Sequence, residues 1–352
     1  MTDAVRRHDP EVRGFASDNW AGVHPEVLEA LALANGGHQT SYGTDDYTEA
    51  LQHVFARHFG ERAQVYPVAT GTGANVVALQ ALLPRWGAVI TADTAHVNAD
   101  ECGAAEKVGG IKIYPVESPD GKLTPELVDR QSWGRGHEHR AQPLAVSLTQ
   151  STEMGTCYSI EEIRALCDHA HDQGMMVHLD GARLANAAAH LGAGLGEITT
   201  DAGVDIVSFG GTKNGLMMAE AVVVLTPERI DEITYLRMSS TQLVSKMRFV
   251  SVQLEALLAG NLWLRNALHA NAMATRLATA AARIEGVRIA RPVQSNGVFA
   301  VLPPEVAERL RKRFPFHTWD ESTGEVRWMC AFDTTPQDVD AFVEALETEM
   351  RA

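Results

Sequence analysis

The sequence predicts an α/β protein in which a large domain, built on a mainly parallel seven-stranded sheet between helices, precedes a smaller C-terminal α/β domain. Two observations carry this prediction. Seven short apolar runs rich in β-branched residues occur before residue 226, and segments with helical periodicity separate most of them. The chain then becomes rich in Ala and Leu before it returns to short apolar runs. Its 352 residues leave room for one large and one small domain.

Seven segments are predicted to form the strands of the large sheet. They are residues 64–69, 88–92, 111–116, 144–149, 175–180, 205–209 and 221–225. Strands that alternate with helices form parallel sheets covered on both faces. Only a short turn containing Lys213 separates the last two segments, so we expect 221–225 to join the sheet antiparallel.

The C-terminal part of the chain has a different pattern. Residues 227–285 are predicted to be almost wholly helical. From Gly286 three short apolar runs alternate with two helical segments, 303–314 and 335–350. We place the division near residue 250, which gives an N-terminal segment and large domain (1–250) and a linking helix with a small C-terminal domain (251–352).

Composition narrows the classes of function. The net charge of −15 argues against binding nucleic acid or an anionic lipid surface. The four cysteines lack CxxC or zinc-finger spacing, so we expect no metal site and no disulfide framework, and reduced thiols suit the cytoplasm. The opening segment lacks the apolar core of a secretion signal, and no run reaches the ~18 apolar residues of a membrane span. We therefore expect a cytoplasmic protein without nucleic-acid or membrane partners.

A glycine-rich turn follows the first predicted strand. In open α/β sheets, ligands bind outside the carboxyl ends of the strands. Gly71, Thr72 and Gly73 stand there, directly before a helix whose first N–H groups are available to a phosphate. The alternative is an ordinary tight turn between strand and helix.

Four more polar residues follow other strands at the same edge. His96 follows the second strand, Asp180 and Arg183 follow the fifth, and Lys213 follows the sixth. Each has an ordinary alternative: a structural histidine, a helix N-cap for Asp180, a surface ion pair for Arg183, and a loop lysine that reaches water.

Together these residues match the needs of pyridoxal 5'-phosphate (PLP). This cofactor requires a phosphate cradle, a lysine amine for its aldehyde, an acid for the pyridine nitrogen and a platform for the ring. Other cofactors fit less well, because the first strand is not followed by GxGxxG with an acid about 20 residues on, and no GxxxxGK[ST] motif is present.

Motifs along nearly the whole chain carry a resemblance to one enzyme family. From about residue 15 to 335, the chain resembles the low-specificity L-threonine aldolases, which are PLP enzymes of the aspartate aminotransferase fold (fold type I). The motifs are FASDNWAGVHPEVLEAL, SYGTDDYT, VATGTGAN, TAHVNADECGA, DGKLTPE, LTQSTEMGT, HLDGARLANA, VSFGGTKNG and SKMRF. The resemblance implies a lyase that cleaves L-threonine, L-allo-threonine and related β-hydroxy-α-amino acids to glycine and an aldehyde.

The resemblance also implies roles for residues at the cofactor. Lys213 would carry PLP covalently, Asp180 would pair with the pyridine nitrogen, and the ring of His96 would stack on the cofactor. Arg183 would clamp the substrate carboxylate bidentately. Ser17 and Arg327 match positions that help to hold that carboxylate.

The base that takes the β-hydroxyl proton is left open between His96, His139, Glu101 and a water molecule. Some relatives carry a histidine after the fourth strand, where this chain has Thr152 and Glu153.

Three further residues point to a shared active site. By resemblance Tyr42 lines the site, and Lys246 and Arg248 reach the phosphate in a neighbouring subunit. The alternative for Lys246 and Arg248 is a solvated helix face. The shared site implies at least a dimer, and the family is usually tetrameric, so a homotetramer is expected.

Competing functions remain at this stage. They are a PLP-dependent β-eliminating lyase or a phenylserine-type aldolase on the same fold, a PLP-binding regulator without turnover, and an α/β scaffold in which Lys213 is incidental.

Overall fold

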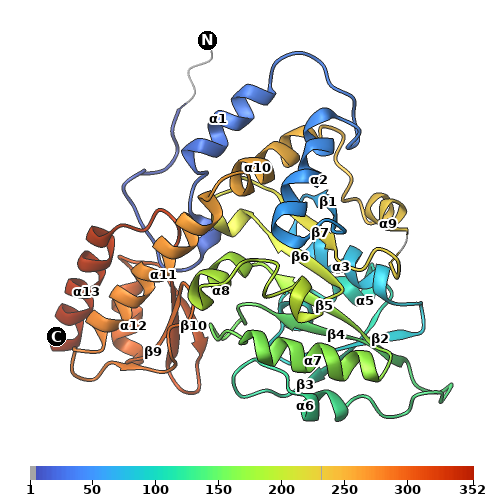
Figure 1. Cartoon of the computed structure of the whole chain (residues 1–352). Helices are drawn as coiled ribbons and strands as arrows, with labels where there is room; N and C mark the ends of the chain where they lie inside the picture. The colour runs from blue at the N-terminus through green and yellow to red at the C-terminus, as the bar shows by residue number, and fades with distance from the viewer. Residues whose placement is uncertain (1–4, 231) are drawn as a thin grey trace.

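The computed structural model describes residues 5–230 and 232–352. Its larger sheet has seven strands in the order β1-β7-β6-β5-β4-β2-β3, and Figure 1 shows it between layers of helices. The strands are β1 (Gln64–Val68), β2 (Gly87–Ala92), β3 (Lys112–Val116), β4 (Gln142–Thr149), β5 (Met176–Gly181), β6 (Ile206–Gly210) and β7 (Glu220–Val224). The predicted fold class is confirmed.

Pairing within this sheet follows the expected directions. The pairs β2–β3, β2–β4, β4–β5 and β5–β6 are parallel. Strand β7 runs antiparallel to both β6 and β1, as its short connection to β6 predicts. The carboxyl ends of β1, β2, β4, β5 and β6 therefore lie at one edge.

Helices cover both faces of the larger sheet, so its strands are apolar on both sides. In β7, Ala221 and Val223 belong to one hydrophobic core, whereas Val222 and Val224 belong to the other. The helices of the N-terminal part are α1 (Pro25–Ala34), α2 (Asp46–Phe59), α3 (Gly71–Leu82), α4 (His96–Ala99), α5 (Ala104–Lys107), α6 (Pro125–Asp129), α7 (Ile160–Asp172) and α8 (Leu184–Leu191). Three 3₁₀ turns are η1 (Asp18–Trp20), η2 (Thr200–Ala202) and η3 (Thr212–Asn214).

The segment after β7 is helical but interrupted. It forms α9 (Ile233–Ser239), α10 (Arg248–Leu258) and α11 (Leu262–Ala281). Helix α11 packs against α8 beside the larger sheet and against α13 in the C-terminal unit, which connects the two parts of the molecule.

The C-terminal unit has its own sheet and core. Its antiparallel sheet has the order β10-β11-β9-β8, with β8 (Arg288–Ile289), β9 (Gly297–Val301), β10 (His317–Asp320) and β11 (Glu325–Met329). Helices α12 (Pro304–Arg311) and α13 (Pro336–Arg351) complete it. Strand β10 was not predicted from the sequence, because it is short, polar and only partly buried.

The N-terminal segment packs onto this C-terminal unit. Phe15 is buried in the C-terminal core, its N–H donates to Pro315 O at 2.8 Å, and its carbonyl accepts from Met329 N at 2.8 Å. Among the described residues, no helix is both long enough and apolar enough to cross a membrane.

Candidate active site

Asp180 lies near the carboxyl end of β5 with both carboxylate oxygens engaged. Its Oδ2 accepts from Asn75 Nδ2 at 2.9 Å, and its Oδ1 accepts from the N–H of Ala182 at 3.0 Å. The side chain does not cap the next helix, because Arg183 is the N-cap residue of α8. The N-cap alternative for Asp180 is therefore wrong, and its buried carboxylate is held in one orientation at the edge of the sheet.

Asn75 connects Asp180 to His96. Its Nδ2 also donates to Glu101 Oε1 at 2.8 Å, and the same oxygen lies 2.9 Å from His96 Nδ1. The hydrogen bond to Glu101 raises the pKa of His96 above its usual value. The sequence reasoning missed Asn75, although it lies two residues after the glycine-rich turn, in the buried part of α3.

Lys213 sits in the tight turn η3 between β6 and β7, and neighbouring groups fix this turn. Glu220, the first residue of β7, accepts from Gly211 N at 2.8 Å. Asn214 donates from Nδ2 to the carbonyl of Trp263 on α11 at 3.0 Å. The backbone that carries Lys213 is thus tied to the sheet and to α11.

The surroundings of Lys213 favour a neutral amine. Burial lowers the pKa of its ammonium group, and the nearby charge of Arg183 lowers that pKa further. The carboxylates of Asp18, Asp180 and Glu220 oppose the shift but do not cancel it. A lowered pKa increases the fraction of the neutral amine, which is the form that attacks a carbonyl group, so an incidental loop lysine is a poor description of Lys213.

Arg183 is already paired within the chain. Its Nε donates to Asp18 Oδ2 at 2.7 Å and its Nη2 donates to Asp18 Oδ1 at 2.9 Å; Asp18 is buried and Arg183 is partly buried. Burial alone would raise the pKa of Asp18, but Arg183 outweighs it and lowers the pKa to about 2. Asp18 occupies the Nε and Nη2 edge of the guanidinium, so a substrate carboxylate would meet the remaining N–H groups of Arg183.

A small cavity lies beside Arg183. Arg327 on β11 lines it together with Ser151, Glu153 and Phe299. Arg327 Nε is buried and has no hydrogen-bond partner among the described residues. The structure therefore places Arg327 and Arg183 at the same cavity.

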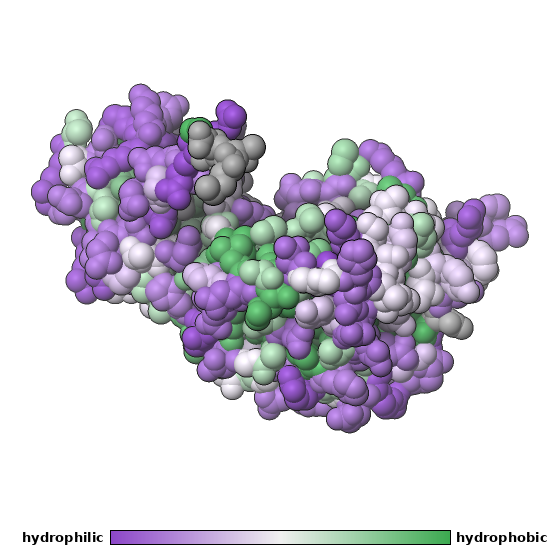
Figure 2. All heavy atoms as spheres, turned by 90° about the horizontal axis from the view of Figure 1, so that it is seen from above, coloured by the Kyte–Doolittle hydropathy of each residue, from purple (hydrophilic) through white to green (hydrophobic). Residues whose placement is uncertain are grey.

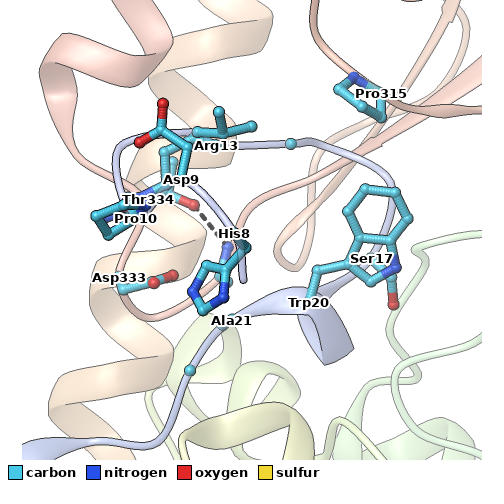
Figure 3. Close-up of a pocket in the computed structure, with 14 residues that line it drawn as sticks. His8, Asp9, Pro10, Arg13, Ser17, Trp20, Ala21, Pro315, Asp333 and Thr334 are labelled. Carbon is cyan, nitrogen blue, oxygen red and sulfur yellow. Dashed lines mark hydrogen bonds between the residues drawn. The ribbon is translucent and has the colours of Figure 1, made fainter. Parts of the chain in front are cut away.

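Ser17 is placed differently from Arg327. Its Oγ accepts from Asn19 N at 3.2 Å and so caps η1. Figure 3 shows Ser17 with Trp20 on one side of a hollow whose other side includes His8 and Asp9. Ser17 does not line the cavity of Arg327, but the next residue, Asp18, holds Arg183.

The glycine-rich turn begins α3 at the carboxyl end of β1. Thr70 caps the helix by accepting from Gly73 N at 3.1 Å, which leaves the amides of Gly71 and Thr72 in the first turn without helical partners. A Cβ atom on Gly73 would lie 2.1 Å from Cδ of Gln242, so a larger residue there would require the Gln242 side chain to move. The free amides suit a phosphate group.

Tyr42, Lys246 and Arg248 form a second group. They line one surface hollow, Tyr42 N donates to Ser245 O at 2.9 Å, and the Tyr42 side chain is exposed. None of the three lines the cavity beside Arg183.

His139 lies far from the residues at the carboxyl edge of the larger sheet. It stands three positions before the first residue of β4, at the amino end of the parallel strands, and its side chain is 91% exposed. Within one chain it cannot act as the base, because the other candidates lie at the opposite edge of the sheet. The described residues contain no cluster of His, Cys, Asp and Glu placed to hold a metal ion.

Comparisons with known proteins agree with the sequence resemblance. The profile of the beta-eliminating lyase family matches residues 14–303. The chain is 39% identical to the low specificity L-threonine aldolase of Pseudomonas sp. (strain NCIMB 10558) over 340 residues, which cover 96% of this chain and 97% of the relative. It is 40% identical to the enzyme of the same name from Pseudomonas aeruginosa, over 91% of this chain and 93% of the relative.

A solved structure agrees as well. The threonine aldolase of Leishmania major superposes with a TM-score of 0.90 at 27% identity, and the match covers 96% of this chain and 99% of that one. The sequence resemblance is thereby confirmed along nearly the whole length. The chain belongs to the beta-eliminating lyase family and, within it, to the low-specificity L-threonine aldolases.

Proposed function

We propose that this protein carries pyridoxal 5'-phosphate on Lys213 and cleaves L-threonine, L-allo-threonine and related β-hydroxy-α-amino acids to glycine and an aldehyde. The observation that carries the proposal is the buried Lys213 amine, whose pKa is lowered, at the same sheet edge as Asp180 and Arg183. Relatives of nearly the same length bear the name of this activity.

The residues present fit each part of the cofactor. The free amides of Gly71 and Thr72 suit the phosphate, the carboxylate of Asp180 suits a protonated pyridine nitrogen, and His96 offers a flat ring. When bound, PLP withdraws electrons from the α-carbon of an amino acid, so that a bond to that carbon can break.

The protein's own residues would orient the substrate for this chemistry. The carboxylate of Asp180 is fixed in one orientation, because Asn75 and the N–H of Ala182 donate to its two oxygens. Arg327 and the remaining N–H groups of Arg183 would hold the α-carboxylate. Holding that carboxylate decides which bond of the α-carbon breaks, because reaction needs a defined orientation.

Substituting Lys213 by alanine tests the proposal. The purified wild type should be yellow and should release acetaldehyde and glycine from both threonine isomers, whereas Lys213→Ala should lose the colour and at least about 10³-fold in kcat. Absorbance spectra and an aldehyde assay measure both. A colourless, active wild type would refute the cofactor assignment, and ammonia with 2-oxobutanoate as products would identify an eliminating enzyme instead.

We also propose that the active sites are shared in a homotetramer. Tyr42, Lys246 and Arg248 form a partly cationic hollow apart from Lys213, which suits the phosphate of a neighbouring subunit. Figure 2 shows apolar atoms gathered on the face seen from above. Exposed apolar side chains include Leu28, Leu33, Met217 and Met218. Apolar patches of this kind mark contact surfaces between proteins.

A cytoplasmic location completes the proposal. All four cysteines, Cys102, Cys157, Cys167 and Cys330, are unpaired. Free thiols persist where the environment is reducing.

A further inference from the structure

The cavity beside Arg183 contains a carboxylate that the roles above do not use. Three polar atoms at this cavity are buried and have no hydrogen-bond partner among the described residues: Ser151 Oγ, Glu153 Oε2 and Arg327 Nε. A buried polar atom without a partner is costly. This cavity of about 10 Å³ therefore offers an acceptor, a hydroxyl and a guanidinium N–H to one small polar group.

Glu153 is fixed so that one oxygen remains free. Its Oε1 accepts from the backbone N–H of His96 at 2.7 Å, which leaves Oε2 unpartnered. The backbone around it is held as well, because Thr152 N donates to Thr156 O at 2.9 Å and the two threonine hydroxyls lie 2.7 Å apart. The free oxygen thus belongs to a preorganised side chain.

We propose that the Glu153 carboxylate takes the proton of the substrate β-hydroxyl group as the Cα–Cβ bond breaks, and returns it when the bond forms. This inference rests on the proposed aldolase function. The O–H bond breaks, and its electron pair becomes the second C–O bond of the aldehyde. The Cα–Cβ electron pair remains with the α-carbon, and a proton added to that carbon completes glycine.

The lining of the cavity favours Glu153 over the other candidates. Among the described residues that line the cavity with the two arginines, Glu153 is the only carboxylate. Nδ1 of His96 is engaged by Glu101, whose own carboxylate does not line the cavity. A ligand carboxylate held by Arg327 would therefore lie beside Glu153, which lines the same small cavity.

The charges around Glu153 suit a base at neutral pH. Burial raises the pKa of Glu153 to about 7, and the charge of Asp180 contributes to the increase while the charge of His96 opposes it. Arg183 and Arg327 also face this carboxylate across the cavity. A base must be deprotonated to act, so the rate of cleavage should rise as pH increases through about 7.

The first experiment separates proton removal from the rest of the reaction. Glu153→Gln keeps the acceptor for His96 N but cannot take a proton. We expect threonine cleavage to fall about 10²- to 10⁴-fold, with loss of the rise near pH 7. Exchange of the glycine α-hydrogen in D₂O, followed by NMR, needs no β-hydroxyl and should continue at the wild-type rate. Glu161→Gln, on the exposed start of α7, is the matched control and should behave as wild type in both assays.

Two results would overturn the inference. Wild-type cleavage by Glu153→Gln would show that another group takes the proton, and parallel loss of exchange and cleavage would show a merely structural role. A wild type that releases no aldehyde would instead refute the aldolase function, which is a separate failure. Should Glu153→Gln not fold, Glu153→Asp withdraws the carboxylate by one methylene and is expected to lose cleavage but keep exchange.

The second experiment needs no cofactor. A carboxyl group whose pKa is raised on folding binds its proton more tightly in the folded state, so it makes the protein less stable as pH rises from about 4.5 through about 7. As pH rises, the melting temperature of the cofactor-free wild type should therefore fall relative to that of cofactor-free Glu153→Gln. A constant difference between pH 5 and pH 8 would show that Glu153 ionises normally and would overturn the inference.

Discussion

Asp18 and Arg183 show how a single ion pair sets the charge of the site. The two oxygens of Asp18 accept from Nε and Nη2 of Arg183, and a third donor, Asn296 Nδ2, reaches Asp18 Oδ2 at 3.0 Å. Without Asp18, Arg183 would be a buried cation beside the Lys213 amine. The pair therefore keeps Arg183 in place and moderates its effect on the pKa of Lys213.

Replacing Asp18 by asparagine should be strongly destabilising. Removing one partner of a buried pair leaves the other charge without compensation, which costs about 3–5 kcal/mol. The matched control is Asp340→Asn, because Asp340 also holds an arginine, Arg276, through both oxygens, but at the surface. The control substitution should lower the free energy of unfolding by less than about 1 kcal/mol. Urea unfolding of both variants measures the difference, and equal losses would contradict the role given to Asp18.

The residues that the sequence reasoning missed share one property. Asn75 bonds to Asp180 across 105 positions, and Asp18 bonds to Arg183 across 165. Such partners cannot be recognised from spacing, because only the fold brings them together. Lys213, Asp180, Arg183 and His96 were found because each follows a strand, and strand ends meet at one edge.

At the scale of elements, the strands were predicted best. All seven strands of the larger sheet begin within two residues of their predicted starts, because buried parallel strands are continuous apolar runs. The helical region after β7 was predicted as nearly continuous, but it is broken between α9 and α10 and between α10 and α11. The second break contains Gly260 and Asn261, which favour a helix end but leave no mark in the apolar periodicity.

The contact between β6 and the loop after β5 depends on one glycine. A Cβ atom on Gly210 would lie 2.5 Å from Ala182 O and 2.6 Å from Ala182 Cα. Gly210→Ala should therefore separate the strands that carry Lys213 and Asp180, and it should cost at least about 2 kcal/mol of unfolding free energy. Thermal unfolding measures this loss.

A glycine in open space provides the control for that variant. No atom lies within 4 Å of the Cβ position on Gly36. Gly36→Ala should change the unfolding free energy by no more than about 0.5 kcal/mol. If Gly210→Ala and Gly36→Ala unfold at the same temperature, the close approach of Ala182 to Gly210 does not constrain the site.

At the scale of the whole molecule, sharing of active sites can be tested by mixing subunits. If Arg248 serves a neighbouring subunit, each active site takes Lys213 from one chain and Arg248 from the other. The variants Lys213→Ala and Arg248→Ala then damage different chains of the same site. Each variant alone should be nearly inactive. Random reassembly of equal amounts should restore about a quarter of the sites in a symmetric dimer, since half of the dimers are mixed and each has one intact site. A mixture no more active than its components would contradict the shared site.

The position of Phe15 has a mechanical consequence for the molecule. Phe15 is anchored by backbone hydrogen bonds to Pro315 and Met329, and Asp18, only three residues later, is anchored to Arg183. Three residues span at most about 10 Å, so there is little slack between these two anchors. A rotation of the C-terminal sheet would therefore move residues 15–18 and, with them, Asp18, the counter-ion of Arg183. The orientation of the C-terminal unit is thus coupled to the charge balance beside Lys213.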